Sequence, residues 1–179
     1  MLITGMLGPV IARAQEPDSP HALVITVDGI INNVKEGFIA RAIDKAEENG
    51  ATLLIIQLDT PGGLLSSTRE VVELLLESPV PIAVFVSPRG ARAGSAGTFI
   101  TAAGNFAVMA PGTNIGAASP ISATGEDLDD TLASKVENDA AALIRSIAQT
   151  RGRNQDKLEE TVWTAASYSA QEALSDNVV

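Results

Sequence analysis

Four short apolar runs, separated by segments with helical spacing, constrain the fold of this chain most. The runs are rich in Val, Ile and Leu and cover residues 22–27, 52–58, 82–86 and 106–110. Between the first three, segments 36–49 and 64–77 place apolar residues three and four positions apart, which is typical of one helix face. Continuous apolar strands that alternate with helices predict a mostly parallel sheet flanked by helices. The predicted fold class is therefore α/β.

The rest of the chain fits the same domain. Residues 30–34 predict a further strand or a loop, and residues 121–130 predict a polar loop. A long amphipathic helix is expected from Leu132 to Ile147, followed by short helices around 157–162 and 170–174. A single domain over residues 21–179 is long enough to bury a sizeable core.

Residues 1–20 have a different character. The first twelve are mostly apolar, and Ala12-Arg13-Ala14 matches the small-x-small pattern of a signal-peptide cleavage site. The basic start of such a peptide is missing, so we expect a truncated signal peptide and a polar lead-in. A disordered N-terminus and the end of an upstream helix are the alternatives. The sequence contains no apolar run of the roughly 18 residues that a membrane-spanning helix requires.

Composition excludes several classes of function. The net charge is −10 and no basic stripe is present, so nucleic acid is not an expected partner. Cysteine is absent, which excludes disulfides, cysteine-based zinc sites and a cysteine nucleophile. The acidic residues Asp127, Asp129 and Asp130 lack the spacing of a calcium loop. No metal and no cofactor is predicted.

Ser95 is the candidate nucleophile. It lies in the glycine- and alanine-rich stretch 89–98, after the third apolar run and before a helix of small residues. A serine needs a base to act as a nucleophile. The one histidine, His21, precedes the first strand, whereas the α/β-hydrolase order places histidine after the serine. The sequence thus argues against a Ser-His-Asp triad.

Lysine is the remaining base, and Lys135 is the candidate among four lysines. It lies between Leu132 and Val136, at the edge of the apolar face of the long helix. Packing there would take its amine out of water and favour the neutral form that a general base needs. A lysine at a helix edge that extends its amine into solvent is the structural alternative, and spacing alone leaves both open.

The segment Asp59-Thr60-Pro61-Gly62-Gly63 ends the second strand before a helix. Its backbone N–H groups are unobstructed by side chains and are suited to holding the oxyanion of a tetrahedral intermediate. The N–H of Ala96, at a helix N-terminus, is a second candidate donor. A plain strand-to-helix turn is the alternative. Arg89 and Arg92 are candidates for orienting a substrate, or are solvated loop residues.

Four motifs taken together resemble a known family. The segments 59–63, 91–97, 111–121 and 169–174 are similar to the NfeD-type membrane-bound serine proteases. That family belongs to the Clp-protease/crotonase superfamily and is related to signal peptide peptidase A. The resemblance covers roughly residues 21–179 and implies a fold of repeated strand-strand-helix units.

The resemblance also implies a function. It implies a serine endopeptidase with a Ser95–Lys135 dyad and an oxyanion site at Gly62 or Gly63 and Ala96. The implied substrates are apolar segments of membrane-associated proteins, such as stomatin-like partners. Family members tend to form homodimers, and they carry transmembrane helices that are absent from this chain. We therefore expect a fragment of a membrane-associated protein, with its protease domain periplasmic or extracellular.

Two other functions fit the same fold. A crotonase-like acyl-CoA enzyme uses an oxyanion hole, but generally with a carboxylate base, and the net charge of −10 is unfavourable for an anionic CoA. A non-catalytic scaffold for membrane assembly would retain the fold and leave Ser95 inert.

Overall fold

The computed structural model describes residues 19–120 and 129–179. The predicted signal peptide and most of the predicted polar loop, residues 121–128, lie outside this part. Within it, no helix is both long and apolar enough to cross a membrane.

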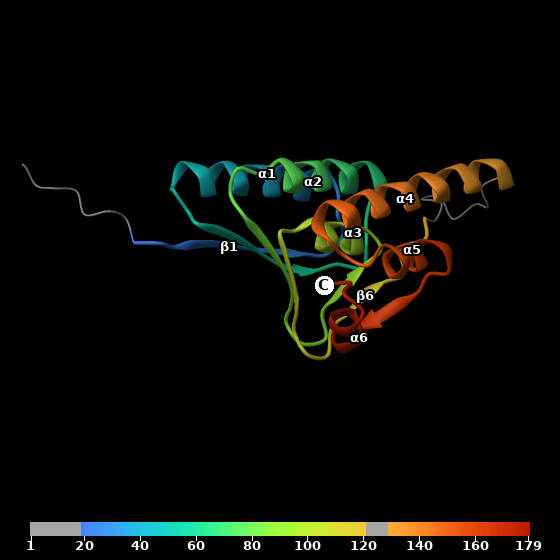
Figure 1. Ribbon diagram of the computed structural model, residues 1–179. Helices are drawn as coiled ribbons and strands as arrows, with labels where there is room; N and C mark the ends of the chain where they lie inside the picture. Colours follow the sequence, from blue (N-terminus) through green and yellow to red (C-terminus); the bar gives the residue numbers. More distant parts are fainter. Residues whose placement is uncertain (1–18, 121–128) are drawn as a thin grey trace, which may run out of the picture.

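A four-stranded parallel sheet forms the centre of the fold. Its strands are β1 (Ala22–Asp28), β2 (Leu53–Asp59), β3 (Ile82–Val86) and β5 (Phe106–Met109), in that spatial order. All neighbours pair in parallel, which confirms the predicted sheet. Between them lie α1 (Asn33–Glu48), α2 (Leu65–Glu77) and α3 (Ala96–Ala103). Connections between neighbouring parallel strands are right-handed. Because these strands follow one another in chain order, their connecting helices lie on the same face of the sheet. Figure 1 shows α1 and α2 side by side on that face.

The core lies between this sheet and its helices. The helix-facing side chains of β2 and β3 are fully buried, and they are Leu54, Ile56, Leu58, Ile82, Val84 and Val86. The outward residues of β1 are exposed, and Val24 retains half of its surface. The continuous apolar run 22–27 predicts a buried strand. That prediction was wrong for β1, because it is an edge strand with helices on one face only.

A second, smaller sheet was not predicted. It contains β4 (Arg92–Gly94), β6 (Asn114–Gly116) and β7 (Ser167–Ser169). β4 and β6 are parallel, and β7 joins β6 in the antiparallel direction. Strands of three residues are too short to show a hydrophobic period. This sheet matters because β4 ends directly before Ser95.

The C-terminal part is helical, as predicted. It contains α4 (Asp130–Arg151), α5 (Gln155–Trp163) and α6 (Ala170–Ser175). The carboxylate of Asp129 accepts hydrogen bonds from the N–H groups of Thr131 and Leu132 and begins α4. α1 begins three residues earlier than expected, because Asn32 caps it through the N–H groups of Val34 and Lys35.

Candidate active site

Ser95 occupies a strained turn between β4 and α3. Its backbone angles are φ 48° and ψ −107°, a conformation that residues with a side chain rarely adopt. The Ser95 N–H donates to the Gly116 carbonyl at 2.9 Å, and the Ser95 carbonyl accepts from the Thr98 N–H at 2.9 Å. The buried Thr98 hydroxyl lies 3.1 Å from the carbonyl oxygens of both Ala93 and Gly116. These bonds hold the turn in its strained form.

The Ser95 side chain is available for chemistry. The residue is half-buried, and its hydroxyl makes no hydrogen bond to any residue in 19–120 or 129–179. A serine on such a turn presents its oxygen beyond the backbone, as a nucleophile must.

The Pro-Gly-Gly turn after β2 packs directly against Ser95. A Cβ atom on Gly62, where φ is +133°, would lie 2.9 Å from the Cβ of Ser95. A Cβ atom on Gly63 would lie 2.0 Å from the Ile31 carbonyl oxygen. Both positions therefore require glycine, which brings backbone N–H groups next to the serine.

The two glycines differ in their hydrogen bonding. The Gly62 N–H donates to the Thr60 hydroxyl at 3.1 Å. The N–H groups of Gly63 and Ala96 donate to no group in the described part of the chain. Both residues line the same cavity as Ser95. Of the two glycines that the sequence nominated, the geometry favours Gly63.

This cavity has a volume of about 590 Å³ and a largely apolar lining. Separate parts of the chain supply its walls: Ile30, Pro61, Gly62, Gly63, Leu64, Leu65, Thr68, Ser95, Ala96, Phe99, Ala118, Pro120, Val136 and Ala140. Ile30 and Leu64 are also exposed, so the apolar surface continues outward from the cavity. The site is suited to an apolar ligand that passes close to the Ser95 hydroxyl.

Lys135 lies beside this cavity but is exposed. It makes no hydrogen bond or ion pair with a described residue. Of the two environments that the spacing left open for Lys135, the structure shows the exposed one. The apolar face of α4 runs through Val136 and Ala140, which line the cavity, and Lys135 is turned about 100° from Val136 around the helix.

Two contacts place Lys135 along the cavity. Arg69 of α2 forms an ion pair with Asp139 of α4, and the Arg151 guanidinium donates to the Leu75 carbonyl at 3.1 Å. α2 and α4 therefore run in the same direction. Lys135 lies one turn before Asp139 and so reaches the level of the first turn of α2, where Leu65 lines the cavity.

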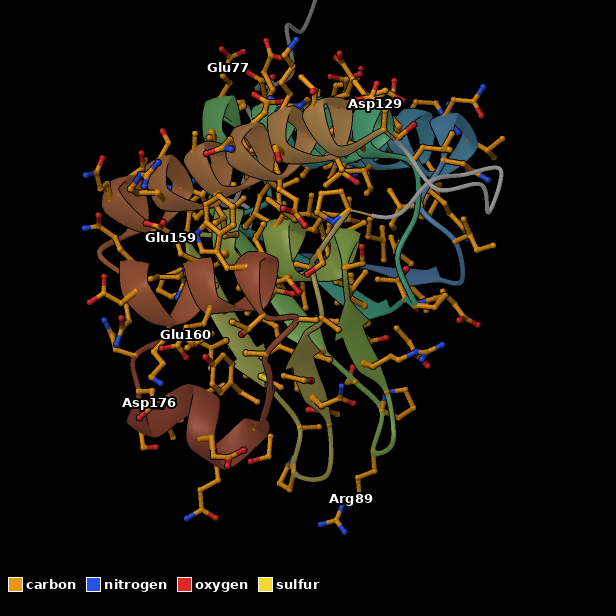
Figure 2. The ribbon with its side chains drawn as sticks, turned by 90° about the vertical axis from the view of Figure 1, so that its right-hand side faces the viewer. Glu77, Arg89, Asp129, Glu159, Glu160 and Asp176 are labelled. Carbon is orange, nitrogen blue, oxygen red and sulfur yellow. The ribbon has the colours of Figure 1, made fainter. Side chains whose placement is uncertain are left out.

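Other candidates lie away from the cavity. His21 precedes the first residue of β1, whereas the cavity follows the last, and a seven-residue strand spans about 23 Å. Figure 2 shows Arg89 at the tip of a loop, at the opposite end of the molecule from Asp129 and the start of α4. Arg92 is exposed on β4 and does not line the cavity.

Sequence reasoning missed Thr60, Thr98 and Phe99. Thr60 and Thr98 hold the backbone around Ser95, and Phe99 lines the cavity one turn after it. A threonine among glycines and alanines is the signal that could have found the first two. Nowhere in residues 19–120 and 129–179 do three or more His, Cys, Asp or Glu side chains form a group that could hold a metal ion.

The parallel sheet, its helices and the turn at Ser95 define an α/β protein with a Clp-protease-like fold. The chain belongs to the family described as the NfeD1b N-terminal domain, whose model matches residues 21–162.

Two curated relatives are similar in sequence. Membrane-bound protease PH1510 of Pyrococcus horikoshii is 36% identical over 159 residues, which are 87% of this chain and 36% of that protein. Membrane protein NfeD1b of Bacillus subtilis is 34% identical over 100 residues, which are 54% of this chain and 22% of that protein. The matched part of the chain thus spans about a third or less of the length of these relatives.

Solved structures agree with the fold. Two describe the 1510-N membrane-bound stomatin-specific protease, each 34% identical to this chain, with a TM-score of 0.84 over 91% of it. One is a serine-to-alanine mutant, and the match covers 79% of its chain. The other is a lysine-to-alanine mutant in complex with a substrate peptide, and the match covers 75% of its chain.

Proposed function

We propose that this chain is the protease domain of a membrane-associated serine endopeptidase that cleaves apolar peptide segments. The observation that carries the proposal is Ser95, a strained serine in an apolar cavity whose hydroxyl makes no hydrogen bond to residues 19–120 or 129–179. Two N–H groups without a partner among the described residues, on Gly63 and Ala96, line the same cavity. The likeness to a protease of similar fold supports it further.

The proposed mechanism uses a serine and a lysine. Neutral Lys135 accepts the proton of the Ser95 hydroxyl while the oxygen attacks the carbonyl carbon of the peptide bond. The Gly63 and Ala96 N–H groups hold the resulting oxyanion. The carbon–nitrogen bond then breaks, and Lys135 gives its proton to the leaving amine. Lys135 then takes a proton from water as the water oxygen attacks the carbonyl carbon of the acyl-enzyme. The bond from that carbon to the Ser95 oxygen breaks, the carboxylic product leaves, and Lys135 returns the proton to the Ser95 oxygen.

Substrate completes the environment of the base. Lys135 is exposed to water in this structure. Three exposed apolar residues surround this region. Ile30 and Leu64 line the cavity, and Leu132 lies one turn before Val136 of the cavity wall. An apolar peptide bound across these residues covers the lysine, removes water and favours the neutral amine. Lys135 thus becomes a base when substrate is bound.

The substrate and the setting follow from the relatives. One relative is named as specific for a stomatin homologue, and both curated relatives are named as membrane proteins. We extend this to an apolar segment of a stomatin-like membrane protein as the substrate of this chain. On the resemblance alone, we also propose a homodimer, and a protease domain on the extracytoplasmic side of the membrane.

The test measures cleavage of a quenched fluorescent peptide with an apolar centre. Ser95→Ala and Lys135→Ala should each lower kcat at least about 10³-fold, because each removes a group that acts in the bond-breaking steps. The control is Lys45→Ala, which removes an exposed lysine of α1 and should leave kcat unchanged. Circular dichroism checks that all variants are folded. Near-normal activity of Lys135→Ala would refute the dyad, and activity of Ser95→Ala would refute the serine mechanism.

A further inference from the structure

Thr60 lies between the two halves of the site and is completely buried. Its N–H donates to the Arg92 carbonyl at 2.8 Å, and its carbonyl accepts from the Gly94 N–H at 2.9 Å. These bonds join the end of β2 to β4, on both sides of Ala93, directly before Ser95. The backbone of Thr60 is therefore held in place relative to the nucleophile.

The Thr60 hydroxyl makes two hydrogen bonds to one residue of the Pro-Gly-Gly turn. It accepts from the Gly62 N–H and donates to the Gly62 carbonyl, both at 3.1 Å. The Gly62 carbonyl accepts a second hydrogen bond, from the Ile31 N–H at 2.9 Å. Two donors from different segments thus fix the direction of this carbonyl.

The direction of that carbonyl sets the direction of the next N–H. A peptide unit is planar and trans, so the Gly62 carbonyl and the Gly63 N–H point in opposite directions. With the carbonyl held by Thr60 and Ile31, the Gly63 N–H is directed away from the atoms that hold it. Gly63 itself lines the cavity beside Ser95. A peptide between two glycines rotates with little steric resistance, so it needs such a constraint.

We propose that Thr60 is a positioning residue whose hydroxyl holds the Gly62–Gly63 peptide with its N–H directed at the oxyanion. This inference rests on the proposed protease function. The hydroxyl also occupies the Gly62 N–H, so that Gly63 alone is the donor on this side of the site. Thr60 acts through the backbone and does not touch the substrate.

The methyl group of Thr60 has a separate role. It lies 2.7 Å from where a Cβ atom on Gly97 would stand, so it packs against the first turn of α3. Thr60→Val retains this branched shape and removes the hydroxyl. Thr60→Ser retains the hydroxyl and removes the methyl. This pair separates positioning from packing.

The first experiment compares wild type, Thr60→Val and Thr60→Ser on the fluorescent peptide and on a peptide aldehyde, which forms an oxyanion with Ser95. Thr60→Val should lower kcat about 100-fold, which is the usual effect of losing one oxyanion donor, and it should weaken binding of the aldehyde by a similar factor. KM should change less than about twofold, and Thr60→Ser should stay within about threefold of wild type. An equal loss in both variants, or a loss in KM rather than kcat, would overturn the proposal.

The second experiment needs no catalysis and no variant. In wild-type protein labelled with ¹⁵N, the Gly62 amide hydrogen should exchange slowly, because it is bonded to a buried hydroxyl. The Gly63 amide resonance should shift on addition of the aldehyde, while that of Gly62 should not. A shift of the Gly62 amide resonance in place of the Gly63 resonance would overturn the assignment of Gly63 as the oxyanion donor. If the wild type neither cleaves nor binds aldehyde, the proposed function fails, and a fast-exchanging Gly62 amide separately refutes the role of Thr60.

Discussion

At the scale of single residues, Ser95 is the proposed nucleophile, and its backbone conformation lowers the stability of the fold. Its backbone conformation costs on the order of 1–3 kcal/mol, which the bonds to Gly116 and Thr98 offset. Glycine adopts a positive φ without this cost. The strain is therefore a consequence of carrying a side chain at this turn, where we propose the nucleophile.

This predicts a difference between two inactive variants. The free energy of unfolding of Ser95→Gly should be about 1 kcal/mol higher than that of Ser95→Ala. Ser95→Gly should therefore unfold at a higher urea concentration. Both remove the hydroxyl and should be inactive, so activity does not enter the comparison. Urea denaturation followed by circular dichroism measures it. Equal stability of the two variants would show that the turn is not strained.

At the scale of elements, two arginines at the end of α4 hold the end of α3: Arg151 is the last residue of α4, and Arg153 follows two residues later. The Arg153 guanidinium donates to the carbonyls of Ala102 and Gly104 at 3.0 and 2.9 Å. Arg151 donates to the Ala103 carbonyl at 2.7 Å. Burial, and then the charge of Arg151, lower the pKa of Arg153 from its usual value. Positive charge at a helix C-terminus also complements the helix dipole.

Loss of this contact should destabilise the protein. Arg153→Ala is expected to cost about 2–3 kcal/mol, because it removes two charge-assisted hydrogen bonds from buried carbonyls. Arg153→Lys should recover less than half, since an ammonium lacks the planar fork of donors. The control, Arg145→Ala, breaks a surface ion pair with Glu159 and should cost at most about 1 kcal/mol. Thermal unfolding measures the stability of each variant. A larger loss of stability in Arg145→Ala than in Arg153→Ala would contradict the prediction.

A second element contact depends on pH. The Tyr168 hydroxyl on β7 and the Lys157 ammonium on α5 donate to the Glu160 carboxylate at 2.7 and 3.0 Å. These bonds, that from Tyr168 first, lower the pKa of Glu160 from 4.5. A carboxyl group whose pKa is lower in the folded than in the unfolded state stabilises the fold at pH values above its unfolded-state pKa. This contribution is lost as the pH falls through the folded-state pKa.

Glu160→Gln should therefore reduce stability at pH 7 and have a smaller effect as the pH falls below about 4.5. Urea titrations between pH 3 and pH 7 measure the difference from wild type. Glu77→Gln is the control, because Glu77 is exposed and should show little difference at any pH. Figure 2 shows both residues, with Glu77 at the far end from Glu160. A pH-independent effect of Glu160→Gln would contradict the prediction.

At the scale of the whole molecule, the cavity exists only because distant segments meet. The β2–α2 turn, α3 and α4 are separated by tens of residues, yet Gly63, Ser95 and Ala140 line one space. Ala140 is completely buried on the cavity side of α4. Its small side chain leaves room that a larger one would fill.

Filling that room should change selectivity. Ala140→Leu is expected to raise KM about tenfold for peptides with a bulky apolar residue at the cleavage site, with a smaller effect on peptides that carry alanine there. Ala142→Leu makes the same change at an exposed position of α4 and should leave KM unaltered. Equal effects on both peptides would mean that Ala140 does not border the bound side chain. Thermal unfolding shows whether the variant remains folded.

Much of the fold was predictable because its signals are local. Apolar runs and helical spacing located the four strands of the main sheet and the helices, mostly within one to three residues. Ser95 and the two glycines were also predictable, since a serine among small residues and a Pro-Gly-Gly turn are readable in a short window. The first sheet and the candidate nucleophile were thus within reach of the sequence.

Other features depend on contacts between distant residues. The three short strands of the second sheet carry no period of their own and form only by pairing, across 22 residues between β4 and β6 and across 51 to 55 residues between β6 and β7. The exposure of Lys135 depends on how α4 is rotated against its neighbours, because a residue at the edge of an apolar stripe is consistent with either environment.

The sequence by itself determined the order of the main-sheet strands and of the helices, and it nominated Ser95, Lys135, Gly62, Gly63 and Ala96. Only the tertiary structure decided that Gly62 packs against Ser95 and donates to Thr60, and that the Gly63 N–H, in the same cavity, remains without a partner among the described residues. The physical reason is that propensity and periodicity act over a few residues. The direction of a single peptide group is decided by hydrogen bonds from segments that meet only in the folded chain.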